Sequence, residues 1–219
     1  MLNDNYYVGR DYFYIGLIDE RQLSWLENDL SYVPAGSTVV LAMHIPTTLG
    51  QEDRDAFQYG TIGDNLANKT ALYAMLEPYK TLILSGHMHT SDFQKISDNI
   101  TEINIAGLCG AWWCGATCID GTPAGYKAFD FNGDNIKWIY KGCGHKTEYQ
   151  FNAYVDPDQP GHIVANVWDY DPAWKVEYYE DGKKVCDMEQ FTGTDMRARE
   201  LYKDPSSLKR NWVYAAQTS

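Results

Sequence analysis

The sequence has few basic residues and no long apolar run. Its 219 residues include 18 lysines and arginines but 30 aspartates and glutamates, which gives a formal net charge of −12. Because binding to a nucleic-acid backbone depends on clustered lysine and arginine, we expect no nucleic acid among the partners. No segment approaches the roughly 20 apolar residues of a membrane span, and Met1–Asn5 lacks the basic start of a signal peptide. We therefore expect no transmembrane segment.

Cysteine is also scarce. The five cysteines are an odd number, and three of them, Cys109, Cys114 and Cys118, crowd one short segment. Their spacing matches no established zinc motif, so it favours packing or a single disulfide over a soft-metal site. Such crowding fits an oxidising compartment.

The first half of the sequence has the pattern of an α/β unit. Asp19 is a good N-cap for a helix whose apolar stripe continues as far as Tyr32. A continuous apolar run over 38–43 predicts a strand that is buried on both faces. Residues 66–76 then predict a second helix, and residues 81–85 predict a second strand.

After the second strand the pattern changes to short strands and turns. We expect strands at residues 93–97, 100–106, 126–131, 136–140, 150–155, 163–168 and 175–179. The tyrosine-rich residues 1–18 are expected to be irregular, and a change in character near Gly142 favours a boundary there. The sequence therefore predicts a mixed α/β (α+β) protein, with an α/β domain over 1–143 and a small antiparallel β-sandwich domain over 144–219.

Three histidines lie at the predicted strand ends. His44 follows the first strand directly, and His87 and His89 follow the second strand across Gly86. Side chains two residues apart on an extended segment point to the same side, so we expect His87 and His89 to face one site. Open α/β sheets bind ligands at the carboxyl ends of their strands, and imidazole is a common metal ligand. The three imidazoles are therefore candidate metal ligands.

Two adjacent tryptophans, Trp112 and Trp113, lie in a glycine-punctuated loop over 107–115. Large aromatic side chains near a site can line a substrate pocket. They can also pack a loop against the core, and we favour that role for at least one of the two. The sequence leaves both interpretations open.

The histidine motifs resemble those of the calcineurin-like metallophosphoesterase family. His44 is similar to the family's lone histidine at a strand end, and Gly86–His89 is similar to its Gly-His-x-His motif. The segment 14–18 leading into 22–26, and the Gly-Cys-Trp loop at 107–115, are typical of its bacterial multidomain members. The strands near the C-terminus look like the accessory β domain of those members.

The resemblance implies a partial metallophosphoesterase β-sandwich with flanking helices. It also implies a centre of two divalent transition-metal ions (Mn, Fe, Zn or Ni) that hydrolyses phosphate mono- or diesters. His44 and His87 would ligate one ion and His89 the other, with Trp112 and Trp113 as candidates for the substrate pocket. Family members with this accessory domain look like exported bacterial proteins of the periplasm or cell surface.

The sequence also departs from the family pattern. The first three family motifs, Asp-x-His, Gly-Asp-x-x-x-Asp and Gly-Asn-His-Asp/Glu, do not occur before His44. The bridging carboxylate and most ligands of one ion are missing with them. The chain therefore resembles the C-terminal half of the catalytic domain plus the accessory domain, and we expect little activity from it alone. We also expect self-association or a complementing N-terminal half, because half a sandwich leaves a sheet edge unpaired.

Two other functions remain open at this point. The chain can be a non-catalytic module that binds a cell-envelope ligand or has a structural role, with vestigial histidines. It can also be a mononuclear zinc hydrolase, because three histidines and a water molecule form a legitimate catalytic zinc shell.

Overall fold

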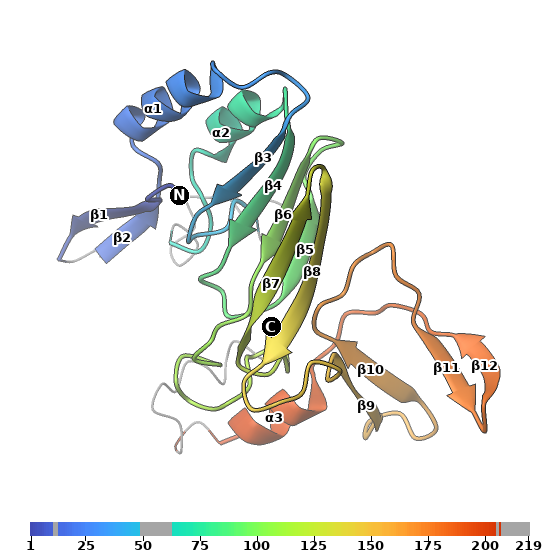
Figure 1. The fold of residues 1–219 in the computed structure, drawn as a ribbon. Coiled ribbons are helices and arrows are strands. Elements are labelled where there is room, and N and C mark those ends of the chain that lie inside the picture. The colour runs from blue at the N-terminus through green and yellow to red at the C-terminus, as the bar shows by residue number, and fades with distance from the viewer. Residues whose placement is uncertain (11–12, 49–62, 205, 207–219) are drawn as a thin grey trace.

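The computed structural model of the protein describes residues 1–10, 13–48, 63–204 and 206, and combines helices with several β-sheets (Figure 1). The elements of this described part are β1 (Asn5–Gly9), β2 (Phe13–Gly16), α1 (Glu20–Leu30), β3 (Thr38–Ala42), α2 (Lys69–Leu76), β4 (Lys80–Ser85), β5 (Asp92–Lys95), β6 (Ile100–Asn104), β7 (Gly125–Asn132), β8 (Asn135–Gly142), β9 (Phe151–Val155), β10 (Ile163–Val167), β11 (Glu177–Glu180), β12 (Lys183–Asp187) and α3 (Met196–Tyr202). This strand-rich mixture confirms the expected α/β (α+β) class.

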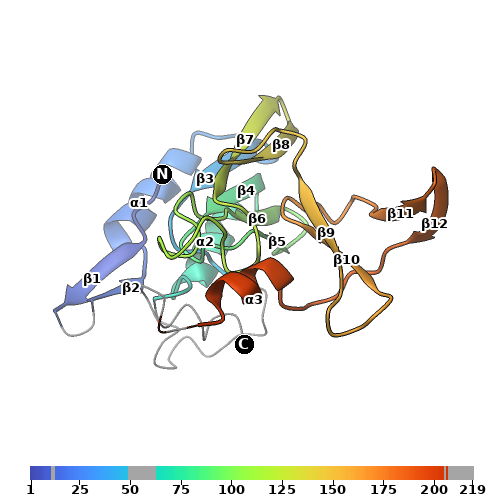
Figure 2. The same cartoon turned by 90° about the horizontal axis from the view of Figure 1, so that it is seen from below.

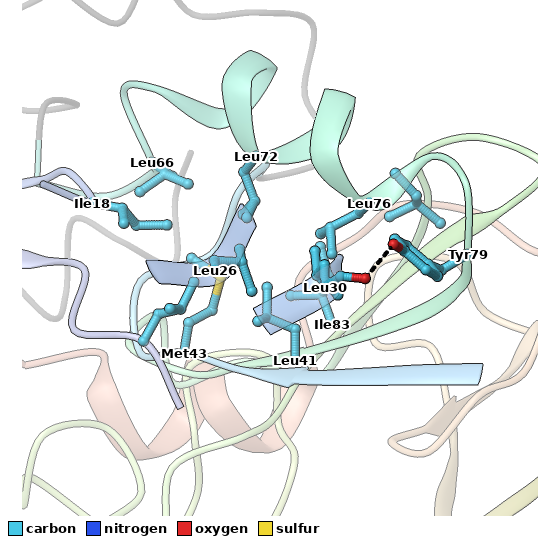
Figure 3. Packing of buried hydrophobic residues seen from close by; sticks show 12 residues of the cluster. Ile18, Leu26, Leu30, Leu41, Met43, Leu66, Leu72, Leu76, Tyr79 and Ile83 are labelled. Atoms are coloured by element: carbon cyan, nitrogen blue, oxygen red, sulfur yellow. Dashed lines mark hydrogen bonds between the residues drawn. The ribbon is translucent and has the colours of Figure 1, made fainter. Parts of the chain in front are cut away.

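A four-stranded sheet in the order β3-β4-β6-β5 forms the centre of the first half. Strands β3, β4 and β6 are parallel, and β5 is antiparallel to β6. Helices α1 and α2 cover one face of this sheet through a buried apolar cluster (Figure 3). The cluster includes Leu26 and Leu30 of α1, Leu72 and Leu76 of α2, Leu41 of β3 and Ile83 of β4. Because β3 and β4 are adjacent and parallel, their carboxyl ends meet at one edge.

The two predicted helices form with small differences at their ends. The Asp19 carboxylate caps α1 by accepting a hydrogen bond of 2.8 Å from the Gln22 N–H, as the sequence indicates. Helix α2 begins at Lys69, three residues later than expected. The reason is that Leu66 bridges to Gly16 and donates its N–H to the Pro46 carbonyl, which keeps this part of the chain extended.

The β7–β8 hairpin lies against the other face of the sheet (Figure 1). Trp138 of β8 packs on Phe93 of β5, with ring centroids 6.4 Å apart. Asp134, in the hairpin turn, pairs with Lys80 at 2.7 Å and so joins the turn to the start of β4. Strand β3 is the outer strand of the sheet and Val40 remains 41% exposed, so the expectation that this strand is buried on both faces is wrong.

The C-terminal region forms two separate hairpins, β9–β10 and β11–β12, followed by α3 (Figure 2). A buried ion pair of 3.0 Å between Lys127 of β7 and Asp169, just after β10, joins this region to the β7–β8 hairpin. The sequence anticipated β9, β10 and β11 but not β12 or α3. The domain boundary after residue 143 stays a prediction.

The N-terminal segment is more regular than expected. Strands β1 and β2 form an antiparallel hairpin, so the prediction of an irregular segment over 1–18 is wrong. Tyrosine and β-branched residues favour strands, and both β1 and β2 contain them. None of the described helices is both long and apolar enough to span a membrane.

Candidate functional site

The ends of β3 and β4 bring His44 and His87 together, as the sequence predicts. Backbone hydrogen bonds continue beyond both strands. The Met43 N–H donates to the Leu84 carbonyl and the Gly86 N–H donates to the His44 carbonyl, and both N···O distances are 3.0 Å. The two histidines therefore follow paired backbone at the same edge of the sheet. Their positions depend on the strand register and not on side-chain packing alone.

The imidazoles of His44 and His87 are in direct contact. His44 Nε2 lies 3.1 Å from His87 Nδ1, and the ring planes are inclined at 72°. Two nitrogens that share one ion at about 2.1 Å each lie roughly 3 to 3.4 Å apart. The two nitrogens, which share a hydrogen bond in this structure, therefore have the separation of two ligands of a single ion. The other nitrogen of His87, Nε2, is 3.2 Å from the Tyr14 hydroxyl of β2.

The surroundings of His87 favour its neutral form. Burial and the charge of His44, with a smaller effect of His89, lower the pKa of His87 to about 4, although a hydrogen bond to the Gly63 carbonyl acts in the opposite direction. A metal ion binds only the neutral imidazole. His87 is thus in its ligating form at neutral pH.

His89 is oriented by the loop at 107–115. Its Nδ1 lies 2.6 Å from the Gly110 carbonyl, a short contact that favours a proton on Nδ1, while the Trp112 N–H approaches the same nitrogen at the longer distance of 3.3 Å. The ring stacks on Trp112 with centroids 4.3 Å apart, and a Cβ at Gly107 would lie only 2.8 Å from His89 Nδ1. Burial lowers the pKa of His89. The glycine and the tryptophan of this loop therefore fix the ring.

The expected extended geometry of His87 and His89 is wrong. Strand β4 ends at Ser85, and both histidines adopt left-handed backbone angles, with φ of 71° and 55°. As a result His87 contacts His44, whereas His89 contacts the 107–115 loop. The two rings still affect each other's surroundings, because the charge of His89 contributes to the low pKa of His87.

The two tryptophans of the loop differ in exposure. Trp112 is half-buried and packs with a small cluster that includes Ala198 and Tyr202 of α3. Tyr202 also donates a hydrogen bond to the Thr117 carbonyl, so α3 supports the loop from the C-terminal region. Trp113 is 66% exposed. The packing role anticipated for at least one of the pair therefore applies to Trp112.

Left-handed backbone is concentrated at this site. Six non-glycine residues of the described part have positive φ, and four of them are His87, His89, Trp112 and Trp113. Such conformations cost about 1 to 3 kcal/mol each and persist where the surrounding structure holds them. They tend to occur at functional sites, so their clustering marks this region of the molecule.

The strain at Trp113 can be measured because its side chain is exposed. Trp113→Gly is expected to be more stable than Trp113→Ala by about 1 kcal/mol, since glycine adopts a φ of 64° without a Cβ clash. Trp25, which is 52% exposed within α1, is the matched control. There the order is expected to reverse, with alanine favoured by about 1 kcal/mol. Urea unfolding of the four variants measures both differences in stability. If glycine and alanine ranked in the same order at the two positions, the backbone of Trp113 would not be strained.

The described cysteines are all free. Cys118 is buried and its thiol pKa is raised by that burial, while Cys109 and Cys114 are half-buried. No disulfide forms among the described residues, and Cys114 and Cys118 pack in two small apolar clusters, one of the two roles that the spacing of the three crowded cysteines favoured. Cys109 Sγ lies 3.6 Å from His89 Nδ1 and adds to the packing around that ring.

Sequence reasoning missed two buried carboxylates beneath the histidines. Asp4 accepts hydrogen bonds from the N–H groups of His44, at 3.2 Å, and Ile45, at 2.5 Å. Glu102 of β6 is 1% exposed and accepts from Thr47, three residues after His44. A charged residue inside an apolar strand was a usable signal for Glu102, whereas nothing in the pattern around Asp4 indicated its role.

The residues present fit only part of a metal centre. Within the ranges that the structure describes, no three histidine, cysteine, aspartate or glutamate side chains are placed to hold one ion. The His44–His87 pair offers two nitrogens, and His89 offers a third from a different direction. The described part alone therefore does not supply a complete centre of two ions.

Comparison with known families gives a match over the second half of the chain. Residues 102–217 match the family described as the C terminal of Calcineurin-like phosphoesterase. The matched segment is more than half of the chain and contains Trp112 and Trp113, but it begins after the three histidines. No curated protein matches the sequence. The chain therefore belongs to the calcineurin-like phosphoesterase family, as the motifs implied, and carries the C-terminal part of it.

Proposed function

We propose that this chain contributes histidine ligands to a centre of two divalent metal ions that hydrolyses phosphate mono- or diesters. Membership of the family supports a phosphoesterase hydrolase lineage. The observation that carries the proposal is the 3.1 Å contact between His44 Nε2 and His87 Nδ1 at adjacent strand ends. In this proposal His44 and His87 bind one ion, and His89 binds the other through Nε2.

The side chains of the site have separate roles in this proposal. Two bound ions such as Mn, Fe, Zn or Ni would supply Lewis acidity and a water of lowered pKa. Tyr14 and the Gly110 carbonyl orient the rings of His87 and His89 by hydrogen bonds to their second nitrogens. Trp112 fixes His89 by stacking, and the exposed Trp113 is left to contact substrate.

The remaining ligands must include carboxylates, because three imidazoles do not hold two cations tightly. We propose that a complementing N-terminal half of the catalytic domain provides them, or that self-association does. The outer edge of β3, where Val40 is 41% exposed, supports an additional partner at this sheet.

The chain by itself is accordingly expected to show little phosphoesterase activity. An assay with p-nitrophenyl phosphate and bis-p-nitrophenyl phosphate in added Mn²⁺ measures this, with His44→Ala/His87→Ala as the background control. Turnover close to that of the double variant is the expected result. Robust metal-dependent turnover that the double variant abolishes would show that the chain carries a complete site.

A mononuclear three-histidine zinc hydrolase is less well supported, because the described residues place no three such side chains around one point. The His89→Ala variant separates the two functions. In the proposed arrangement it keeps the ion held by His44 and His87, whereas a three-histidine zinc site loses its only ion.

A non-catalytic binding module is favoured by one observation, the 66% exposure of Trp113. Metal analysis after dialysis distinguishes this function too. A binding module with vestigial histidines would retain no metal in the wild-type chain. In the proposed arrangement the chain alone holds one ion weakly, and that binding depends on His44 and His87.

A further inference from the structure

Glu102 joins the two histidine-bearing segments through hydrogen bonds. Its Oε1 accepts from the Ser85 hydroxyl at 2.6 Å and from the Thr47 N–H at 3.0 Å. Its Oε2 accepts from the Thr47 hydroxyl and, at 3.2 Å, from the same N–H. The residue is 1% exposed, so these protein groups replace the water that a carboxylate normally binds.

The partners of Glu102 are placed close to the candidate ligands. Ser85 ends β4 two residues before His87, and Thr47 follows His44 by three residues. Glu102 itself lies on β6, where it pairs in register with Ile83 of β4. One side chain of the central sheet thus fixes both segments that leave the edge where the imidazoles meet.

Neighbouring side chains extend the same network. Asn104, two residues after Glu102 and on the same face of β6, donates to the Gly86 carbonyl at 2.7 Å and to Ser85 Oγ at 3.3 Å. The Tyr73 hydroxyl of α2 donates to Thr47 Oγ1 at 2.5 Å. The turn before His87 is therefore held from β6, and the turn after His44 is held from β6 and α2.

We infer that Glu102 is a positioning residue that keeps His44 and His87 at the separation needed to share one metal ion. The inference rests on the proposed function for the metal, but its geometric part concerns this chain alone. Glu102 touches neither histidine. It acts by fixing Thr47 and Ser85, and loss of either bond frees one histidine to move relative to the other.

The carboxylate is required because it accepts from every partner at once. Ser85 and Thr47 direct two hydroxyls and one N–H toward its two oxygens. A glutamine has the same size but replaces one acceptor by an NH₂ donor. Glu102→Gln therefore keeps the volume of the side chain, but in either orientation its NH₂ group faces the Thr47 N–H, and the hydroxyl beside that NH₂ must turn from donor to acceptor.

The test compares Glu102→Gln with Asp169→Asn in the full 219-residue chain. Both variants change a buried carboxylate to its amide, but Asp169 pairs with Lys127, in the part of the fold that carries none of the three histidines. Co²⁺ is titrated at pH 7.5 and followed by its visible absorption, at a temperature where circular dichroism shows all variants folded. Glu102→Gln is expected to weaken Co²⁺ binding at least tenfold, and Asp169→Asn less than twofold.

A second readout does not involve metal. The ¹⁵N shifts of the His87 ring in the metal-free chain report which nitrogen carries the proton, and they are expected to change in Glu102→Gln but not in Asp169→Asn. If Glu102→Gln fails to fold, Thr47→Val serves, because it removes one hydroxyl and leaves the carboxylate. Unchanged ring shifts and unchanged Co²⁺ affinity in a folded Glu102 or Thr47 variant would overturn the inference. If the wild type bound no Co²⁺ but the ¹⁵N shifts of the His87 ring still changed in Glu102→Gln, the proposed function would be refuted and the positioning role supported.

Discussion

Replacing Asp169 by alanine is expected to lower the free energy of unfolding by about 3 to 5 kcal/mol, because it leaves a buried lysine without its partner. Lys127 Nζ lies 3.0 Å from Asp169 Oδ1, and the two side chains are 3% and 0% exposed. Burial lowers the pKa of Lys127 and raises that of Asp169, while the attraction between them opposes both effects. Each buried charge is therefore tolerated only because the other lies beside it.

The measurement is urea unfolding of the wild type and three variants. Lys127→Met/Asp169→Leu is expected to recover most of the loss, since it removes both charges and keeps the buried volume. Asp98→Ala, in the exposed pair with Lys95, is expected to change stability little. A loss of less than 1 kcal/mol for Asp169→Ala would show that the C-terminal region is not held to β7 as described.

The metal-free chain is expected to lose stability as the pH falls from 6.5 to 4, because His87 resists protonation when folded. Its pKa is about 4 in the folded chain and about 6.5 when unfolded, so the unfolded chain binds more protons in this window. This loss of stability is absent above pH 6.5 and is complete below about pH 4. After an allowance for partial exposure of the ring, the loss is about 1 to 2 kcal/mol.

Other groups also titrate in this range, so the His87→Gln variant is the control. The difference in unfolding free energy between wild type and His87→Gln, measured in the presence of a chelator, is expected to shift by most of that amount between pH 7 and pH 4.5. The wild type becomes relatively less stable at the lower pH. A difference that does not depend on pH would mean that the half-buried position of His87 against His44 does not lower its pKa.

The meeting of His44 and His87 could be predicted from the sequence because it depends on local patterns. Two apolar runs, each ending in a histidine and separated by a helix, predict adjacent parallel strands with their ends at one edge. The backbone angles of His87 and His89 could not be predicted in this way. Left-handed conformations at non-glycine residues depend on the contacts that hold them, and here those contacts come from Tyr14 and from the 107–115 loop.

The supporting residues were hidden for a related reason. Glu102 reaches Thr47, 55 residues away, and Asp4 reaches Ile45, 41 residues away, so neither role is visible in a sequence window. Helix α3 has only seven residues, and its buried Ala198 and Tyr202 pack on a loop far earlier in the chain. The β1–β2 hairpin is different, since its aromatic and β-branched residues favour strands and the signal for it is local.

The central claim is that His44 and His87 share a divalent metal ion. Equilibrium dialysis against Zn²⁺ at pH 7.5, followed by metal analysis, tests it in the wild type, in His89→Ala and in His44→Ala/His87→Ala. If the two histidines share an ion, the wild type and His89→Ala bind zinc at a free concentration at which the double variant binds none. Equal zinc binding by the double variant, or no zinc bound to the wild type, would contradict a shared ion.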